Sequence, residues 1–386
     1  MQVFDHVRAS GRAARAEITR ALGISPGSAT AATADLIAGG FLREVEDQPR
    51  ESGRGRPPVA LEVVPTRAHV IGVKLTDERL SAVLTDFAGT HLCEAHRPTP
   101  GHRKGTDEMV ADIAALIERL LADSGVSLDA VGAVGLGVPG MVDHETGTVA
   151  WSPLLSERHV ALRAVLESEL GRPVEVDNDT NMLTLAELWF GAGRENADFA
   201  VVTIEQGVGM GLVLSSRLFR GSQGMGLELG HTKVQLDGAL CRCGQRGCLE
   251  AYLADYALAR EAATALDRPS RNLQSAEALL ETLYLRAKAG DTGAATIFRR
   301  AGRYLALGLA NVVQLFDPTL IILSGQRMRY DYLYADEVLA EMQRLILSDG
   351  RAPPRVEIHA WGDDAWARGA AALALAATTE RLLTAA

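Results

Sequence analysis

Near the N-terminus, apolar residues recur with helical spacing in two adjacent segments. Residues 14–22 carry two apolar side chains four positions apart, which predicts a short helix. Gly23 suits a turn with positive φ, and Ser25 is a preferred N-cap for a second helix over 26–38. Two helices joined by a glycine-containing turn are typical of a helix-turn-helix, whose second helix enters the major groove of DNA.

Two short apolar strands, 41–45 and 59–63, flank the polar segment 48–58 and predict a wing behind these helices. Glycine-flanked arginines at its tip can enter a narrow minor groove or bind phosphates. The residues expected to contact DNA lie on the second helix and the wing tip: Ser25, Ser28, Thr30, Thr33, Arg54 and Arg56. The alternative is a solvated hairpin beside a helical protein-interaction module. Turn, wing and arginine tip together favour DNA binding.

After Pro65 the pattern changes to alternating strands and helices. Strands are predicted at 69–75, 79–85, 91–96, 131–137, 174–176, 199–205, 210–215, 319–323 and 356–359. Helices are predicted at 108–121, 162–170, 180–190, 275–289, 294–316, 331–346 and 363–383. A β-β-β-α-β-α unit followed by a comparable second set predicts an α/β fold of two lobes with a cleft between them. We therefore expect a DNA-binding domain over 1–65 and a second domain over 66–386, with lobe one at about 66–182 plus 363–386 and lobe two at about 183–362.

Composition narrows the class of protein. The 386 residues are 47% hydrophobic, which is enough for more than one buried core. The chain lacks a run of about 18 apolar residues, so no membrane span is expected. Its first residues lack the basic and apolar stretches of a signal peptide, so we expect a protein of the reducing cytoplasm. The net charge of −10 disfavours a chain that binds nucleic acid over its whole surface.

Three of the four cysteines, Cys241, Cys243 and Cys248, fall within eight positions, and His231 precedes them. Three thiols and an imidazole are the donors of a closed tetrahedral zinc site. Buried free cysteines are the alternative, but the clustering disfavours them. A disulfide cannot use all three thiols and is not expected in a reducing compartment. The sequence therefore predicts a structural zinc ion.

Candidate ligand-binding side chains occur in two places. Asn178 and Asp179 follow a strand and open a helix, at the strand end where ligands bind in α/β folds. An amide and a carboxylate suit the hydroxyls of a sugar, and a helix N-cap is the alternative role. Glu228, His231 and Glu250 flank the cysteine cluster. A metal ion there would fix His231 and leave its second nitrogen available for a hydrogen bond.

The run Gly-His at 230–231, followed by Cys-x-Cys-Gly-x-x-Gly-Cys-x-Glu at 241–250, resembles the signature of the ROK family (repressors, open reading frames and kinases). Val138-Pro139-Gly140 supports the resemblance, which extends over nearly the whole chain, and the winged helix is similar to the family's regulator branch. The resemblance implies an actin-like, ribonuclease-H-like two-lobed fold of the sugar-kinase type. It implies zinc on His231, Cys241, Cys243 and Cys248. It also implies a sugar held by Asn178, Asp179, Glu228, His231 and Glu250, with Asp179 at the position of the kinases' general base.

Two departures from the family's kinases point away from catalysis. Kinases carry Asp-x-Gly-Gly-Thr where this chain has residues 72–77, so Lys74 and Leu75 stand where glycines would meet the ATP phosphates. The Gly-Thr-Gly loop is replaced by Glu205-Gln206-Gly207, and a carboxylate repels phosphate. Phosphoryl transfer depends on positioning and charge neutralisation, so we do not expect an active enzyme.

These features predict a sugar-responsive DNA-binding transcriptional regulator, a repressor, with a non-catalytic kinase-like effector domain. Symmetric operators match two-fold proteins, so we expect operator DNA to be bound by a homodimer or a dimer of dimers. One alternative is an ATP-dependent sugar kinase fused to a DNA-binding module, which titration with nucleotide would reveal. The other is a DNA-binding adaptor controlled by a partner protein.

Overall fold

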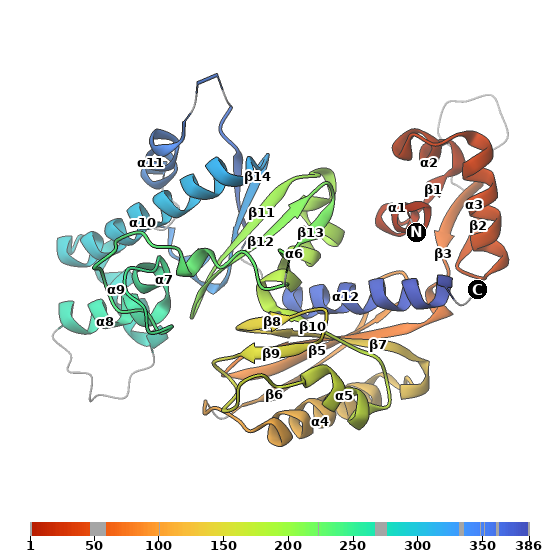
Figure 1. The fold of residues 1–386 in the computed structure, drawn as a ribbon, viewed down its shortest axis with the longest axis horizontal. Helices are drawn as coiled ribbons and strands as arrows, with labels where there is room; N and C mark the ends of the chain where they lie inside the picture. Colours follow the sequence, from red (N-terminus) through yellow and green to blue (C-terminus); the bar gives the residue numbers. More distant parts are fainter. Residues whose placement is uncertain are drawn as a thin grey trace. The chain divides into compact units, whose positions relative to one another are not determined.

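The computed structural model divides the chain into two compact units (Figure 1). The first comprises Met1–Arg194 and Asp363–Ala386, and the second comprises Glu195–Gly362. The second unit is therefore an insertion, because the chain returns to the first unit with its last helix. The structure describes residues 2–46, 59–99, 101–222, 224–266, 276–331, 336–347, 349–350, 352–359 and 363–384.

The first unit begins with a winged helix-turn-helix, as predicted. Its elements are α1 (Gln2–Ser10), β1 (Ala13–Ala14), α2 (Arg15–Leu22), α3 (Pro26–Ala38), β2 (Leu42–Glu46) and β3 (Val59–Val63). The strands form one sheet in the order β1-β3-β2, with β3 antiparallel to both neighbours. The winged-helix elements not predicted from the sequence are β1, which is only two residues long, and α1, whose apolar residues are buried by distant parts of the chain.

The turn between α2 and α3 forms for local reasons. Gly23 has a φ of 63°, in the left-handed region that favours glycine. The Ser25 side chain caps α3, because its Oγ accepts a hydrogen bond from the Ser28 amide at 3.1 Å. Pro26 occupies the first helical position, where a missing N–H costs little. The predicted start of α3 is confirmed.

The remainder of the first unit is a five-stranded sheet with helices on both faces (Figure 1). Its strands are β4 (His69–Leu75), β5 (Arg79–Asp86), β6 (His91–Pro98), β7 (Val131–Val138) and β10 (Val174–Asn178), with a separate hairpin of β8 (Met141–Asp143) and β9 (Thr148–Trp151). Its helices are α4 (Thr106–Ser124), α5 (Leu162–Leu170), α6 (Asp179–Phe190) and α12 (Asp363–Thr384). The sheet order is β10-β7-β4-β5-β6, in which β4, β5 and β6 are antiparallel and β7 and β10 continue parallel to β4.

Helix α12 lies unusually close to this sheet. A Cβ atom on Gly72 would lie 2.0 Å from the carbonyl oxygen of Ala367, and one on Gly135 would lie 1.9 Å from that of Ala370. Glycine is required at both positions because the helix backbone occupies the space of a side chain. The C-terminal helix is thereby built into the core of the first unit.

The second unit repeats the same sheet topology. Its strands are β11 (Phe199–Ile204), β12 (Val208–Leu214), β13 (Arg217–Phe219), β14 (Leu320–Ser324) and β15 (Arg355–His359). Its helices are α7 (Glu250–Leu253), α8 (Asp255–Ala265), α9 (Ala276–Lys288), α10 (Thr292–Phe316) and α11 (Asp336–Leu345). The order β13-β12-β11-β14-β15 again joins an antiparallel set of three strands to two parallel strands. This duplicated α/β topology is the one predicted from the actin-like resemblance.

The longest helices, α10 and α12, have 25 and 22 residues. Within the described ranges, none of the helices combines the length and the apolar character needed to cross a membrane.

Candidate functional site

Four metal-ligating side chains converge in the second unit. His231, at the end of the 3-10 turn Leu229–His231, joins Cys241, Cys243 and Cys248, and their ligand atoms all lie within 4.8 Å of one another. These are the residues that the sequence analysis grouped as a metal site. Three thiolates and an imidazole match the donor set of a closed tetrahedral zinc site, so the residues present fit this ion.

Tight turns bring the cysteines together. The Cys241 amide donates to the Gln245 carbonyl at 2.8 Å, and the Gly244 amide donates to the Cys241 carbonyl at 3.0 Å. Gly247 has a φ of 75°, and a Cβ atom there would lie 1.7 Å from the Gln235 carbonyl oxygen. The glycine that precedes the third cysteine is thus required by the loop backbone.

The His231 ring faces the cluster with one nitrogen and Glu228 with the other. Its Nδ1 lies 3.7 Å from the Sγ of Cys241, and its Nε2 lies 3.9 Å from a carboxylate oxygen of Glu228. Nδ1 is therefore the nitrogen placed to ligate a metal. The second nitrogen points toward a carboxylate whose side chain is 44% exposed, an arrangement common for metal-bound histidines.

Polar groups from outside the ligand set contact the thiols as well. The Lys233 ammonium donates to the Sγ of Cys248 at 2.9 Å, and the Tyr256 hydroxyl donates to the Sγ of Cys241 at 3.5 Å. Burial raises the pKa of the Cys241 thiol and of the Tyr256 hydroxyl. A bound metal ion would reverse this for the thiol, because coordination removes its proton.

Glu250 connects the cysteine loop to the turn between β11 and β12. It is buried at the start of α7, and its Oε1 accepts a hydrogen bond from the Tyr256 hydroxyl at 3.3 Å. Its Oε2 accepts one from the Val208 amide at 3.4 Å. A Cβ atom on Gly207 would lie 3.0 Å from the same oxygen. The structure thus brings Glu228, His231 and Glu250 together around the metal loop of the second unit.

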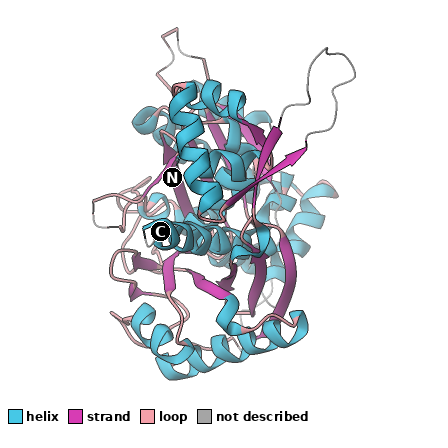
Figure 2. Cartoon of the chain, turned by 90° about the vertical axis from the view of Figure 1, so that its right-hand side faces the viewer, coloured by secondary structure: helices cyan, strands magenta, loops and turns pink. Residues whose placement is uncertain are grey.

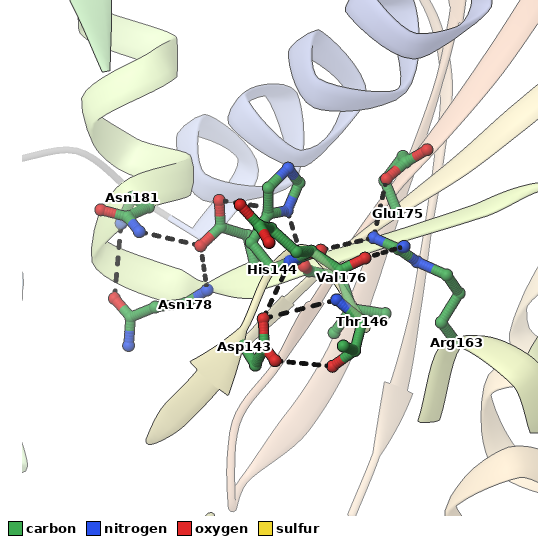
Figure 3. Close-up of polar contacts among 10 residues, drawn as sticks. Asp143, His144, Thr146, Arg163, Glu175, Val176, Asn178 and Asn181 are labelled. Carbon is green, nitrogen blue, oxygen red and sulfur yellow. Dashed lines mark hydrogen bonds and ion pairs between the residues drawn. The ribbon is translucent and has the colours of Figure 1, made fainter. Parts of the chain in front are cut away.

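Asn178 and Asp179 belong to the first unit, where β10 becomes α6. Figure 3 shows Asn178 at this point. Asn178 is the N-cap of α6, since its Oδ1 accepts from the Thr180 amide at 2.9 Å. Its Nδ2 donates to the Gly140 carbonyl at 2.8 Å, which ties the helix start to the Val138-Pro139-Gly140 turn. Capping, the alternative weighed from sequence, is therefore observed, and contact with a sugar stays a prediction.

Asp177 organises this strand end, a role that was not predicted from the sequence. It is fully buried, and its Oδ1 accepts from the Asn178 amide at 2.7 Å and from the Asn181 side chain at 2.8 Å (Figure 3). The Nδ1 of His144 lies 3.7 Å from its other oxygen. A carboxylate at the end of a buried strand was the available signal, because a buried charge must be paired.

Lys74, at the end of β4, also acts on this site. It is only 2% exposed, and its ammonium lies 4.1 Å from the centroid of the Trp366 ring on α12. Burial raises the pKa of the Asp179 carboxyl, and the charge of Lys74 opposes that rise. From the sequence, Lys74 was expected only to stand where the kinases' glycines meet the ATP phosphates. The structure adds that its charge acts on Asp179.

The altered loop at Glu205 packs against a second glycine loop. Gly325 has a φ of 110°, and a Cβ atom there would lie 2.9 Å from the Cγ of Glu205. The Glu205 carbonyl accepts a hydrogen bond from the Asp255 amide at 3.1 Å. Asp255 in turn forms a buried two-bond ion pair with Arg327, which follows Gly325. The two loops are therefore held as one structure.

The start of α3 is exposed, as DNA contact requires. The predicted DNA-contacting residues on the surface are Ser25, Ser28 and Thr30. The predicted wing arginines, Arg54 and Arg56, lie outside the described residues.

The prediction that Thr33 faces DNA is wrong. Thr33 is fully buried, and its hydroxyl accepts a hydrogen bond from Arg15 of α2 at 3.0 Å. The same hydroxyl donates to the Thr30 carbonyl at 3.1 Å. Thr33 lies on the face of α3 that packs toward α2, so its polar group is used inside the domain.

Comparison with known proteins agrees with this architecture. The model of the ROK family matches residues 70–377. A xylose repressor of Caldicellulosiruptor bescii is 26% identical over 341 residues, covering 84% of this chain and 82% of the repressor. A glucokinase of Streptomyces coelicolor is 31% identical over 318 residues, covering 79% of this chain and 96% of the kinase. The crystal structure of a ROK family transcriptional regulator, a homolog of the Escherichia coli MLC protein, superposes with a TM-score of 0.81 at 25% identity and covers 99% of this chain and 96% of that one.

The regulator structure matches the winged helix as well as both halves of the remainder, whereas the glucokinase is matched over nearly its own length by only part of this chain. Because the family model spans most of the sequence, the protein belongs to the ROK family.

Proposed function

We propose that this protein is a sugar-responsive transcriptional regulator, acting as a repressor, that binds operator DNA with its winged helix and a sugar with its ROK domain. The observation that carries the proposal is the winged helix-turn-helix in a chain that a ROK transcriptional regulator matches over 99% of its length. A relative named as a xylose repressor supports the same activity.

The DNA contact is assigned to the first turns of α3. Pro26, Gly27, Ser28 and Thr30 are small and exposed, so the helix can approach bases and phosphates closely. Arg54 and Arg56, which lie in the sequence between β2 and β3, would add phosphate or minor-groove contacts. Because the domain is small and the whole chain is acidic, with a net charge of −10, two copies acting on a symmetric site would supply the affinity.

The effector is assigned to the polar groups that follow β10 and surround the metal loop. Asn178 and Asp179 offer an amide and a carboxylate, and Glu228, His231 and Glu250 offer two more carboxylates and an imidazole. Hydroxyl groups donate and accept, so the donors and acceptors in each of the two units suit a sugar better than an apolar ligand. The class of effector is therefore a monosaccharide or a derivative of one.

Zinc is the metal that fits this set of one histidine and three cysteines, in a structural role. When bound, zinc would hold His231 and the cysteine loop in fixed positions and would take no part in a reaction. The Nε2 of His231 then remains directed at Glu228, and Glu250 remains between Tyr256 and Val208. The metal loop would thus hold the proposed ligand-binding side chains of the second unit in place.

An ATP-dependent sugar kinase is the second candidate, favoured by the 31% identity to a glucokinase. Two features oppose it. Lys74 and Leu75 bring buried side chains where the kinases' glycines meet phosphates, and Glu205 brings a carboxylate to the other phosphate loop. Asp179, on which the charge of Lys74 acts, can still accept a hydrogen bond from a sugar, but no phosphoryl group would be positioned for transfer.

We place the protein in the cytoplasm, where its DNA would be.

One experiment tests the proposal and its rival. A DNA duplex selected by the protein from random sequence is bound in a fluorescence anisotropy assay, with and without xylose, glucose or N-acetylglucosamine. A regulator changes its duplex affinity with one of these sugars and shows no sugar-dependent ATP hydrolysis. Turnover of ATP with any of them, and an unchanged duplex affinity, would establish the kinase instead.

A further inference from the structure

A buried arginine joins the DNA-binding helices to the helices of the sugar-binding region. Arg8 of α1 has a side chain that is 5% exposed. Its Nη1 donates to the Thr379 hydroxyl on α12 at 3.0 Å, and its guanidinium lies 4.2 Å from the Trp189 ring centroid on α6. Figure 2 shows the marked N-terminus, where α1 begins, near the marked C-terminus, which follows α12.

Because this cation is buried, its stability in the fold depends on the groups around it. Its Nη2 donates to a carboxylate oxygen of Asp5 at 2.8 Å, and burial lowers the pKa of Arg8 to about 10, so the group stays charged at neutral pH. A buried charge is tolerated only while its partners keep their geometry. Arg8 therefore responds to displacement of either Trp189 or Thr379.

Around Arg8, the DNA-binding helices and the sheet of the first unit share one hydrophobic core. The Phe87 ring, which follows β5, packs against Phe4 of α1 and Phe41 with centroid distances of 5.4 and 6.5 Å. The same buried cluster contains Ala371 and Leu375 of α12. Helix α1 is thus a packed part of the first unit, and its orientation depends on the helices beneath it.

Helix α6 spans the distance from the candidate sugar residues to Arg8. It begins at Asp179, with Asn178 as its cap, and carries Trp189 in its last turn. Its 12 residues form a rod of about 18 Å at about 1.5 Å per residue. A Cβ atom on Gly369 of α12 would lie 1.7 Å from the Met182 carbonyl oxygen, so the two helices touch by their backbones. A shift at the start of α6 is therefore passed to Trp189 and α12 rather than absorbed by soft side chains.

We infer that Arg8 is a positioning residue that couples the sugar site at the start of α6 to the orientation of the DNA-binding helices. Sugar contact with Asn178 or Asp179 displaces α6, Trp189 moves against the guanidinium of Arg8, and α1 turns with α3. This inference rests on the proposed function. A residue that only stabilised the fold would change stability without changing the effect of sugar on DNA affinity.

The test compares Arg8→Lys and Arg8→Met with Arg12→Met. Arg12 is a suitable control because it pairs with Glu62 at the surface, with a side chain 55% exposed. For each protein, the affinity for the selected duplex is measured with and without the sugar, among xylose, glucose and N-acetylglucosamine, that raises the wild-type melting temperature most. The sugar affinity without DNA is measured by calorimetry. Hydrogen exchange of residues 2–10 and 179–190 is followed in the wild type, which keeps the test independent of variant folding.

The coupling ratio is the factor by which sugar changes the duplex affinity, and such ratios between sites are typically about 5- to 150-fold. We expect both Arg8 variants to keep the sugar affinity within about twofold while their coupling ratio falls to near one, and the Arg12 variant to keep the wild-type ratio. In the wild type, sugar should change the exchange of both 2–10 and 179–190. Two outcomes would overturn the coupling alone. In the first, sugar changes the duplex affinity of the wild type and of the Arg8 variants equally. In the second, sugar changes the wild-type duplex affinity but alters hydrogen exchange only at 179–190. A wild type whose duplex affinity ignores every sugar overturns the proposed function and the coupling with it.

Discussion

Replacing Gly369 by alanine tests the contact between α12 and α6 directly. The new Cβ atom would lie 1.7 Å from the carbonyl oxygen of Met182 and 2.4 Å from its carbonyl carbon. Favourable contact between such atoms needs about 3.5 Å, so the helices would have to separate by roughly 1–2 Å. Because the opposing atoms are backbone, a change of rotamer cannot relieve the overlap.

The size of the effect follows from two opposing contributions. Alanine is favoured over glycine inside a helix by about 0.8–1.0 kcal/mol. Overpacking of a filled core costs about 1–3 kcal/mol and occasionally more. The upper end applies here, because α12 is also pressed against the sheet at Gly72 and Gly135. We therefore expect the free energy of unfolding to fall by about 2 kcal/mol, which for a domain of this size lowers Tm by about 4–8 °C.

Gly27→Ala is the matched control for this prediction. Gly27 also lies in a helix, but a Cβ atom there meets only the Ser25 hydroxyl oxygen, at 3.8 Å. Its replacement should stabilise α3 by about 0.5–1 kcal/mol. Thermal unfolding followed by circular dichroism, with zinc held constant, compares the three proteins. A Gly369→Ala protein that unfolds at or above the wild-type temperature would refute the close backbone contact between α6 and α12.

Three further tests address the sites. Asp179→Asn should remove the effect of sugar on duplex affinity in the anisotropy assay. It should also raise Tm at neutral pH, because burial raises the pKa of Asp179 and its ionisation costs folding free energy above its unfolded pKa of about 3.9. That advantage should vanish in melts below this pH, and a pH-independent difference would contradict the assignment. Cys243→Ser should release zinc to a colorimetric chelator and lower Tm, and metal retained at one ion per chain would count against the metal site formed by His231 and the three cysteines. Ser28→Glu should weaken duplex binding by more than about tenfold through repulsion of phosphates, whereas buried Thr33→Val should leave it nearly unchanged, and equal losses would show that α3 does not present Ser28 to DNA.

Local features of the sequence were sufficient for most elements. The bounds of β4, α5 and α3 agree with the predicted ranges, because periodicity, caps and glycine turns act within a few residues. The metal set was also readable, since its three cysteines lie on one loop and only His231 is separate.

The face of a helix was harder to assign when its residues are small. In α3, alanine, serine, threonine and glycine alternate with little contrast between apolar and polar sides. Thr33 was therefore assigned to the DNA face, although packing against α2 buries it and Arg15 occupies its hydroxyl. Propensity places such a residue in a helix, and only the neighbouring helix decides its direction.

The sequence by itself determined the family, most of the strands and helices, and the donors of the metal site, because each depends on residue types at short spacing. Only the tertiary structure decided which distant residues act on one another. It placed Lys74 where its charge opposes the rise in the pKa of Asp179, and it brought Arg8 to Thr379 across 371 positions of the chain. Such contacts depend on how whole helices pack on a sheet and on one another. Here Gly72 and Gly369, which lack a side chain, set how closely α12 approaches the sheet and α6.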